Sequence, residues 1–234
     1  GGFIVGGIVG GALLGGHHYH VGGFVYDGAK RGYIDRNGNI VIDSKKDKVW
    51  PMTSYGTVIK DSGKLCFVNR KGEIVIQPGD YDAGEMDKFN GLLALKDNSS
   101  DKWGVFDVST GKQVVSFKYD SISFAGTDRL VVVKDHVKNL INMSTGKSLY
   151  SAQTEATIEP FNSDTVTWVH TGKDAYTIID NDGHVLFRDT NNSIEDVKSF
   201  NHGFSSVKSK GKWGVMNAKG EWVVQPTYEA VNIL

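Results

Sequence analysis

The sequence predicts an all-β protein built from six repeats, and three observations lead to this prediction. A hairpin pattern, clearest at residues 212–224, recurs along the whole chain. A phenylalanine recurs at a similar spacing. Beyond residue 24, no long stretch has the apolar periodicity of a helix. Repeats of this kind are typical of propellers and solenoids.

Each hairpin is marked by an Asp or Asn that begins the turn and a glycine that closes it. The Asx side chain can bond back to the backbone, and glycine accepts the positive φ that such turns need. The Asx position alternates between acid and amide, as in Asp35 and Asn69, which a turn tolerates and a general base would not. The turn glycines are therefore predicted to be structural. They lie at steps of 34, 39, 35, 37 and 37 residues: Gly38, Gly72, Gly111, Gly146, Gly183 and Gly220.

A second mark has nearly the same spacing. Phe89, Phe124, Phe161 and Phe200 are separated by 35, 37 and 39 residues. In the third unit the predicted strands are residues 92–96, 103–107 and 113–117, with a less regular edge at 119–124. A unit this small cannot bury both of its faces, so the units must stack on one another.

Six copies suit a closed six-bladed β-propeller, and an open β-solenoid is the alternative. A ring leaves few exposed strand edges, whereas a solenoid needs polar caps. The first and last repeats are as apolar as the middle ones. The sequence therefore favours the propeller for residues 24–234.

Residues 1–16 differ from the rest because they hold only glycine and apolar side chains. Glycines four residues apart are typical of a glycine zipper, in which apolar helices approach closely. We expect this segment to contact other copies of the chain or a membrane; an extended assembly strand and a processed remnant are the alternatives. The expected contact residues are Gly2, Phe3, Gly6, Gly7, Gly10, Gly11, Leu13, Leu14 and Gly15.

Residues 17–23 form a His-rich hinge between this segment and the repeats. His17, His18 and His20 could bind a transition metal. No acidic or cysteine partner lies close in sequence, so a polar collar at the end of the apolar segment is the preferred interpretation.

Composition excludes several classes. The 26 basic and 27 acidic residues leave no basic surface for nucleic acid. Cys66 is the only cysteine, so no internal disulfide can form, and its strand position predicts a buried thiol. Neither a phosphate-binding glycine loop nor a His pattern with metal-ligand spacing occurs in the repeats, so no cofactor and no catalytic residue are predicted.

Tryptophans offer candidate ligand contacts. Most of the five should pack between repeats, and Trp50, beside Pro51 in a divergent loop, is the candidate for exposure. The fourth and fifth units keep least of the repeat pattern, so a specific surface is most expected there.

The stretches Lys102-Trp103-Gly104-Val105 and Lys212-Trp213-Gly214-Val215, with their turns and Pro or Tyr-Asp tails, resemble WG repeats. The resemblance covers residues 24–234 and is weakest in units four and five. It implies a repeat architecture and a bacterial protein that is exported or attached to the cell surface, and it implies no particular activity.

These observations predict a non-enzymatic binding or structural protein, secreted or at the cell surface. Its repeat head would bind an unknown protein or glycan, and residues 1–16 would make an oligomer, a filament or a membrane tether. A glycan-active propeller hydrolase and a membrane-inserting secreted effector are the alternatives.

Overall fold

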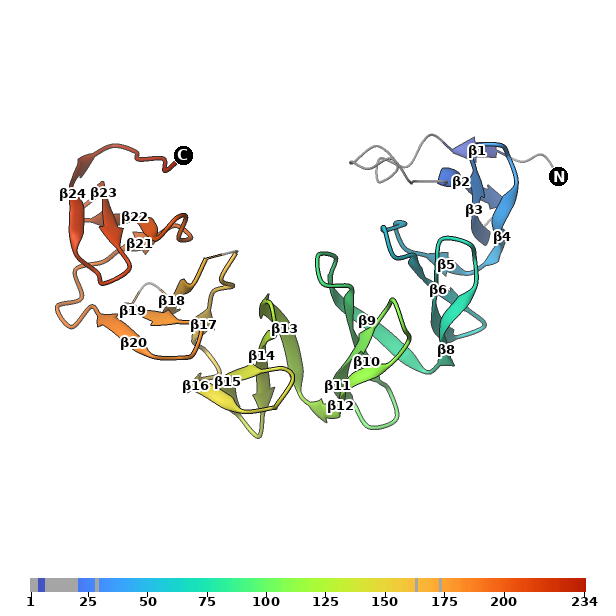
Figure 1. Cartoon of the computed structure of the whole chain (residues 1–234), viewed down its shortest axis with the longest axis horizontal. Coiled ribbons are helices and arrows are strands. Elements are labelled where there is room, and N and C mark those ends of the chain that lie inside the picture. Colours follow the sequence, from blue (N-terminus) through green and yellow to red (C-terminus); the bar gives the residue numbers. More distant parts are fainter. Residues whose placement is uncertain (1–3, 7–20, 28–29, 163, 173) are drawn as a thin grey trace. The chain divides into compact units, whose positions relative to one another are not determined.

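The computed structural model describes residues 4–6, 21–27, 30–162, 164–172 and 174–234. These residues form strands and turns and contain no helix, so none that could cross a membrane. The strands form six separate four-stranded antiparallel sheets, numbered one to six in chain order (Figure 1). The chain divides into two compact units, residues 1–118 and 119–234.

The first unit holds sheets one to three. Its strands are β1 (Ile4–Gly6), β2 (Val21–Asp27), β3 (Lys30–Asp35), β4 (Ile40–Lys46), β5 (Lys48–Val49), β6 (Thr57–Asp61), β7 (Lys64–Val68), β8 (Ile74–Gly79), β9 (Tyr81–Asp87), β10 (Leu92–Asp97), β11 (Lys102–Asp107) and β12 (Gln113–Tyr119). Each group of four successive strands forms one up-and-down sheet.

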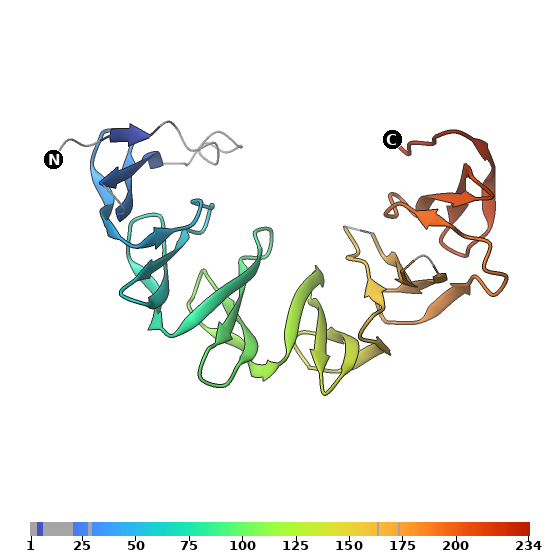
Figure 2. The same ribbon diagram turned by 180° about the vertical axis from the view of Figure 1, so that it is seen from behind.

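The second unit holds sheets four to six, which are coloured yellow-green to red in Figure 2. Within each of these sheets the strands again follow one another in chain order. Its strands are β13 (Ser121–Gly126), β14 (Arg129–Lys134), β15 (Val137–Asn142), β16 (Ser148–Gln153), β17 (Thr157–Ile158), β18 (Val166–Thr171), β19 (Asp174–Asp180), β20 (Val185–Arg188), β21 (Asp196–Val197), β22 (Phe204–Ser209), β23 (Lys212–Asn217) and β24 (Trp222–Tyr228).

The Asx–Gly turn joins the third strand to the fourth in every sheet. All six turn glycines have positive φ, between 72° and 84°. The Asx side chain accepts backbone N–H groups from inside the turn: Asn217 Oδ1 accepts from Lys219 and Glu221, both at 3.0 Å. Asp35 accepts from Asn37 and Asn39 in the same way, at 2.9 and 2.8 Å.

The sheets begin one strand earlier than the repeat pattern suggested. Tyr119 ends β12, and residues 121–126 pair with β14 as the first strand of sheet four. The edge predicted at 119–124 for the third unit thus belongs mostly to the next sheet. Because this strand follows the third unit directly in sequence, periodicity alone could not assign it.

The phenylalanine mark also fails in one unit. Phe161 and Phe200 are buried at 3% and 4% exposure, whereas Phe89 is 88% exposed. Met86 pairs with Leu93 at the position where Phe124 pairs with Leu130 in the next sheet. Met86 therefore fills that position in sheet three, and Phe89 lies in the turn that follows.

Hydrophobic cores lie between consecutive sheets within each unit. In the first unit, Val58 and Phe67 of sheet two pack with Leu95 and Phe106 of sheet three. In the second unit, Trp168 of sheet five packs with residues of sheet six such as Val207 and Met216. Each side chain of this size contributes roughly 1.5–3 kcal/mol when fully buried. A single sheet would leave such a face in water, so neighbouring sheets stabilise one another.

Part of the N-terminal apolar segment differs from the expected helix. Residues 4–6 form strand β1, which pairs with β2 through Ile4–Tyr26, Val5–Val25 and Gly6–Phe24. A strand satisfies backbone groups through its neighbour and suits β-branched residues such as Ile4 and Val5 better than a helix does. The other expected contact residues, and His17, His18 and His20, lie outside the described residues.

Candidate functional site

A cavity of about 910 Å³ lies between sheets five and six, within the second unit. One wall comes from sheet five and includes Glu159, His170 and Tyr176. The other wall is the segment from Asn192 to Ser199, which contains β21. Lys208 of β22 completes the lining. The volume falls within the roughly 300–1,000 Å³ typical of ligand sites. We call this hollow the five–six cavity.

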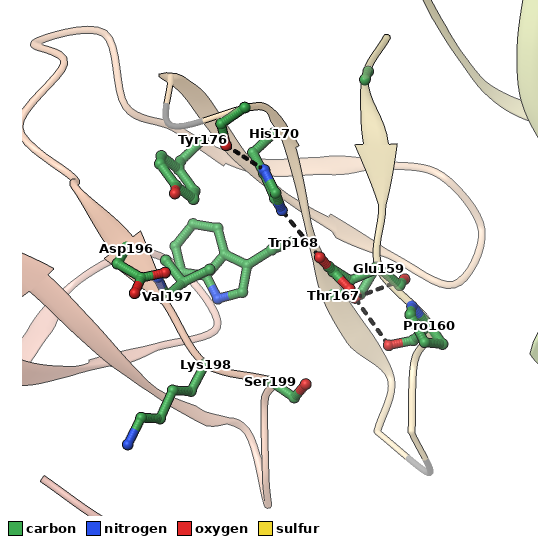
Figure 3. A network of polar contacts seen from close by, with 12 residues as sticks. Glu159, Pro160, Thr167, Trp168, His170, Tyr176, Asp196, Val197, Lys198 and Ser199 are labelled. Atoms are coloured by element: carbon green, nitrogen blue, oxygen red, sulfur yellow. Dashed lines mark hydrogen bonds and ion pairs between the residues drawn. The ribbon is translucent and has the colours of Figure 1, made fainter. Parts of the chain in front are cut away.

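Trp168 lies at the base of the cavity and is almost fully buried, with 1% of its surface exposed. Its ring stacks on Phe200 at 5.4 Å between centroids and lies nearly perpendicular to the Tyr176 ring, with 6.0 Å between centroids. Its indole N–H donates to Ser205 Oγ at 2.9 Å. Figure 3 shows Trp168 between Asp196 on one side and His170 and Glu159 on the other. Trp168 therefore contacts side chains of both sheet five and sheet six.

His170 is held in one orientation from three directions. Its Nε2 lies 3.0 Å from Glu159 Oε1, and its Nδ1 lies 2.8 Å from the carbonyl oxygen of Gly172 (Figure 3). The imidazole also stacks on Tyr176 at 5.1 Å. Both ring nitrogens are therefore bonded, and a carboxylate–imidazole pair of this kind is a group that can transfer protons when one of those bonds opens.

A buried threonine positions Glu159. Thr167 Oγ1 donates to the carbonyl oxygens of Glu159 at 2.9 Å and Pro160 at 3.2 Å (Figure 3). The same arrangement occurs in two other sheets: Thr57 donates to the Trp50 carbonyl and Ser205 to the Lys198 carbonyl, both at 2.6 Å. We call it the hydroxyl clamp.

The hydroxyl clamp occurs where the first strand of a sheet is short. The first strands of sheets two, five and six, β5, β17 and β21, have only two residues each. In sheets three and four, β9 and β13 have seven and six residues, and Leu93 and Leu130 take the clamp position. A hydroxyl therefore replaces ladder bonds that a longer first strand would supply.

Sheet five differs from the other sheets at the positions that line the cavity. Strand register places His170 level with Lys60, Lys96 and Lys208 of sheets two, three and six. Trp168 lies where Ala94 and Ser206 lie in sheets three and six. The larger ring and the imidazole are thus departures from the common repeat. Comparing the repeats strand by strand would have identified both positions from sequence.

The lining carries charges of both signs. Glu159, Glu195 and Asp196 are acidic, and Lys198 and Lys208 are basic. Asp196 Oδ1 accepts the N–H of Val197 at 2.8 Å, and Lys198 Nζ lies 5.2 Å from the centre of the Trp213 ring. The cavity therefore offers donors and acceptors without a dominant charge.

Trp50, the sequence-predicted ligand contact, is partly buried. Its ring packs against the core of sheets two and three, with Lys48 Nζ 4.3 Å from the ring centre. Its carbonyl oxygen accepts Tyr33 Oη at 2.6 Å, and burial raises the pKa of Tyr33 to about 12. Trp50 lies at the clamp position equivalent to Glu159, so it occupies the same place in sheet two without an adjacent histidine.

Cys66 lies in β7, and burial raises the pKa of its thiol, which makes it a poor nucleophile. In the part of the chain that the structure describes, no three His, Cys, Asp or Glu side chains are grouped to hold a metal ion.

Four segments of the sequence match the family model of the WG containing repeat. That family model matches residues 32–59, 67–99, 103–135 and 213–232, which confirms the resemblance carried by the Trp-Gly stretches. No match falls between residues 136 and 212, the stretch that holds Trp168 and His170. No curated protein sequence matches the chain.

Many solved structures resemble the fold. A eukaryotic initiation factor is 13% identical to this chain, with a TM-score of 0.53. The aligned region covers 82% of this chain and 59% of the initiation factor. BamB from Moraxella catarrhalis is 15% identical at a TM-score of 0.39, covering 86% and 65%. Hsv2 from Kluyveromyces lactis is 9% identical at 0.48, covering 83% and 69%. The chain thus spans less than two thirds of the first two proteins. At 13% identity, the similarity to the initiation factor shows a similar fold and nothing more.

Proposed function

We propose that this protein is a non-enzymatic binding module whose ligand site is the five–six cavity. One observation carries the proposal: the cavity lies where the WG repeat pattern is absent and where Trp168 and His170 replace the side chains of other repeats. Departures that only filled the core would not also place a carboxylate–imidazole pair at a solvent-accessible hollow. The ligand is a protein or a glycan.

The repeat head is, in this proposal, a six-bladed β-propeller with an open solenoid as the alternative. Six successive four-stranded antiparallel sheets match the blade number, and cores between consecutive sheets match blade packing. Small-angle scattering separates the two, because a propeller gives a compact particle and a solenoid an elongated one.

Residues 1–16 are proposed to display or assemble this head at the bacterial cell surface or in the extracellular space. The basis is their content of glycine and apolar side chains, whose burial requires a partner surface or lipid. The partner is another copy of the chain or a membrane.

A glycan-active hydrolase is the second candidate. The observation that favours it is the presence of three carboxylates in one cavity, one of them bonded to His170. Paired carboxylates are the usual machinery for cleaving glycosidic bonds. Release of reducing ends from a bound oligosaccharide would support this candidate, whereas binding without turnover supports the binding module.

The direct test is a binding screen with a repeat-restoring variant. Wild type and His170→Lys are titrated by calorimetry with a panel of neutral and charged oligosaccharides and peptides. Lys60→His makes the reverse change in sheet two, away from the cavity, and serves as the control. We expect wild type and the control to bind at least one probe, and His170→Lys to bind it about tenfold more weakly because the Glu159 contact changes. Absence of binding to every probe, or equal affinity for all three proteins, would contradict the proposal.

A further inference from the structure

Resting on the proposed function, we infer that the five–six cavity takes a neutral, hydroxyl-rich ring, that is, a sugar residue of a glycan. The inference depends on the charges of the lining, on the burial of its aromatic rings, and on the kinds of hydrogen bond that its side chains can make.

The charges argue against a strongly charged ligand. The lining contains three carboxylates and two ammonium groups, and one of the carboxylates, that of Glu159, is already bonded to His170. A phosphate or an acidic side chain would meet Glu195 and Asp196, and a lysine-like ligand would meet Lys198 and Lys208. Glu195, Asp196 and Lys198 are exposed, so either ligand would bring like charges together at the rim of the cavity, which costs binding free energy. A ligand without net charge avoids this cost.

The aromatic rings argue against a quaternary or ammonium ligand in particular. Cation recognition needs an open ring face within about 6 Å of the charge. Trp168 and Tyr176 are only 1% and 3% exposed, and one face of each ring is stacked, on Phe200 and on His170 respectively. The rings therefore support the cavity walls and offer no aromatic cage.

The polar groups suit hydroxyls. Carboxylates accept hydrogen bonds only and ammonium groups donate only, whereas each hydroxyl can do both. Asp196 lies in β21 and Lys198 follows that strand, and Trp168 lies between Asp196 and Glu159 (Figure 3). A hydroxyl of one sugar residue can donate to Asp196, and a hydroxyl of the same glycan can accept from Lys198, whose Nζ lies toward Trp213. A peptide backbone offers fewer groups that can satisfy both.

The test uses the full chain and two variants of opposite charge, Asp196→Leu and Lys198→Met. The probes are cellotetraose and chitotetraose, with tetralysine, tetraglutamate and tetraserine peptides as charged and neutral comparisons. Glu221→Leu and Lys219→Met make the same charge changes at exposed positions outside the cavity and serve as matched controls. Calorimetry measures each affinity, and thermal unfolding checks that every variant folds.

We expect at least one tetrasaccharide to bind, and both Asp196→Leu and Lys198→Met to weaken it about tenfold through loss of a charge-assisted hydrogen bond. The matched controls should bind like wild type. If one variant weakens binding of a charged peptide while the other strengthens it, the ligand is charged: the sugar inference is then wrong and the binding module stands. If tetraserine binds more tightly than both sugars, the sugar inference is wrong and the proposed binding module again stands. If no probe binds, the inference and the proposed function both fail.

Discussion

Trp168 donates its indole N–H to the hydroxyl of Ser205, 37 residues further along the chain, at 2.9 Å. Ser205 in turn donates to the carbonyl oxygen of Lys198 at 2.6 Å. One buried hydroxyl thus satisfies the indole at the base of the five–six cavity and also acts as the hydroxyl clamp of sheet six. The geometry of the cavity depends on this residue.

Removing that hydroxyl should destabilise the protein. Ser205→Ala leaves the buried indole N–H and the Lys198 carbonyl without their partner, which costs about 1–3 kcal/mol. Ser116→Ala, at an exposed position of β12, is the control and should cost little. Chemical unfolding monitored by tryptophan fluorescence measures both changes. Equal stability of the two variants would show that the indole bond does not contribute.

The turn glycines should differ in their tolerance of a side chain. Gly146 has φ 74° and open space around it, so Gly146→Ala should cost only the backbone term, about 1–2 kcal/mol. Gly220 has φ 72°, and a Cβ there would lie 2.1 Å from Phe187 Cδ2. Gly220→Ala and Gly220→Val should therefore cost more than Gly146→Ala. Unfolding midpoints that rank the other way would contradict the steric account of this turn.

The free energy of unfolding should decrease as the pH is lowered in the acid range, and Asp107 should account for part of this decrease. The Ser109 hydroxyl, bonded to this carboxylate at 2.6 Å, holds the pKa of Asp107 below its ordinary value. The ionised form therefore stabilises the fold above the unfolded pKa, near about 3.9, and this contribution is lost as pH falls through the lower folded value. The contribution is below about 1 kcal/mol because the group is largely solvated.

Ser109→Ala tests this link. The variant should be less stable than wild type at pH 7, and the difference should shrink in unfolding experiments below about pH 4, as Asp107 becomes protonated. A difference that grew towards low pH would have the wrong sign for this mechanism.

The parts of the fold that could be predicted from sequence are those set by local contacts. The Asx–Gly turns depend on residues within five positions of one another, so Asn217 and Gly220 identified one directly. The cavity joins Glu159, His170 and Asp196 across strands and across two sheets, and no local pattern connects them. The hydroxyl clamp is repeated at Thr57, Thr167 and Ser205, but small hydroxyl residues in strands are too common to have attracted notice.

The boundaries of the sheets were missed for a related reason. A repeat pattern gives the period and leaves open which strand begins a sheet, because that choice depends on pairing. The β1 strand at residues 4–6 shows the same limit. The glycine spacing predicted a helix, but these residues form a strand because they pair with β2.

Residues 1–16 provide a further prediction, on assembly. Gly11→Leu with Gly15→Leu should reduce self-association, because larger side chains prevent the close approach of two copies of this segment. Wild type, the double variant and a chain lacking residues 1–16 are compared by sedimentation and by flotation with phosphatidylcholine–phosphatidylglycerol vesicles. If all three are the same monomer and none floats, the assembly role is wrong.

The central claim is that the ligand binds at the five–six cavity, and the indole N–H signals of the five tryptophans test it most directly. A nitrogen–proton correlation spectrum is recorded during titration with the tightest probe from the binding screen. Trp168→Phe and Trp103→Phe assign the two decisive signals. We predict that the Trp168 signal shifts in a saturable way, because its indole is bonded at the base of the cavity, while the Trp103 signal in sheet three stays in place. A saturable shift of Trp103 or Trp50 with Trp168 unmoved would contradict the account.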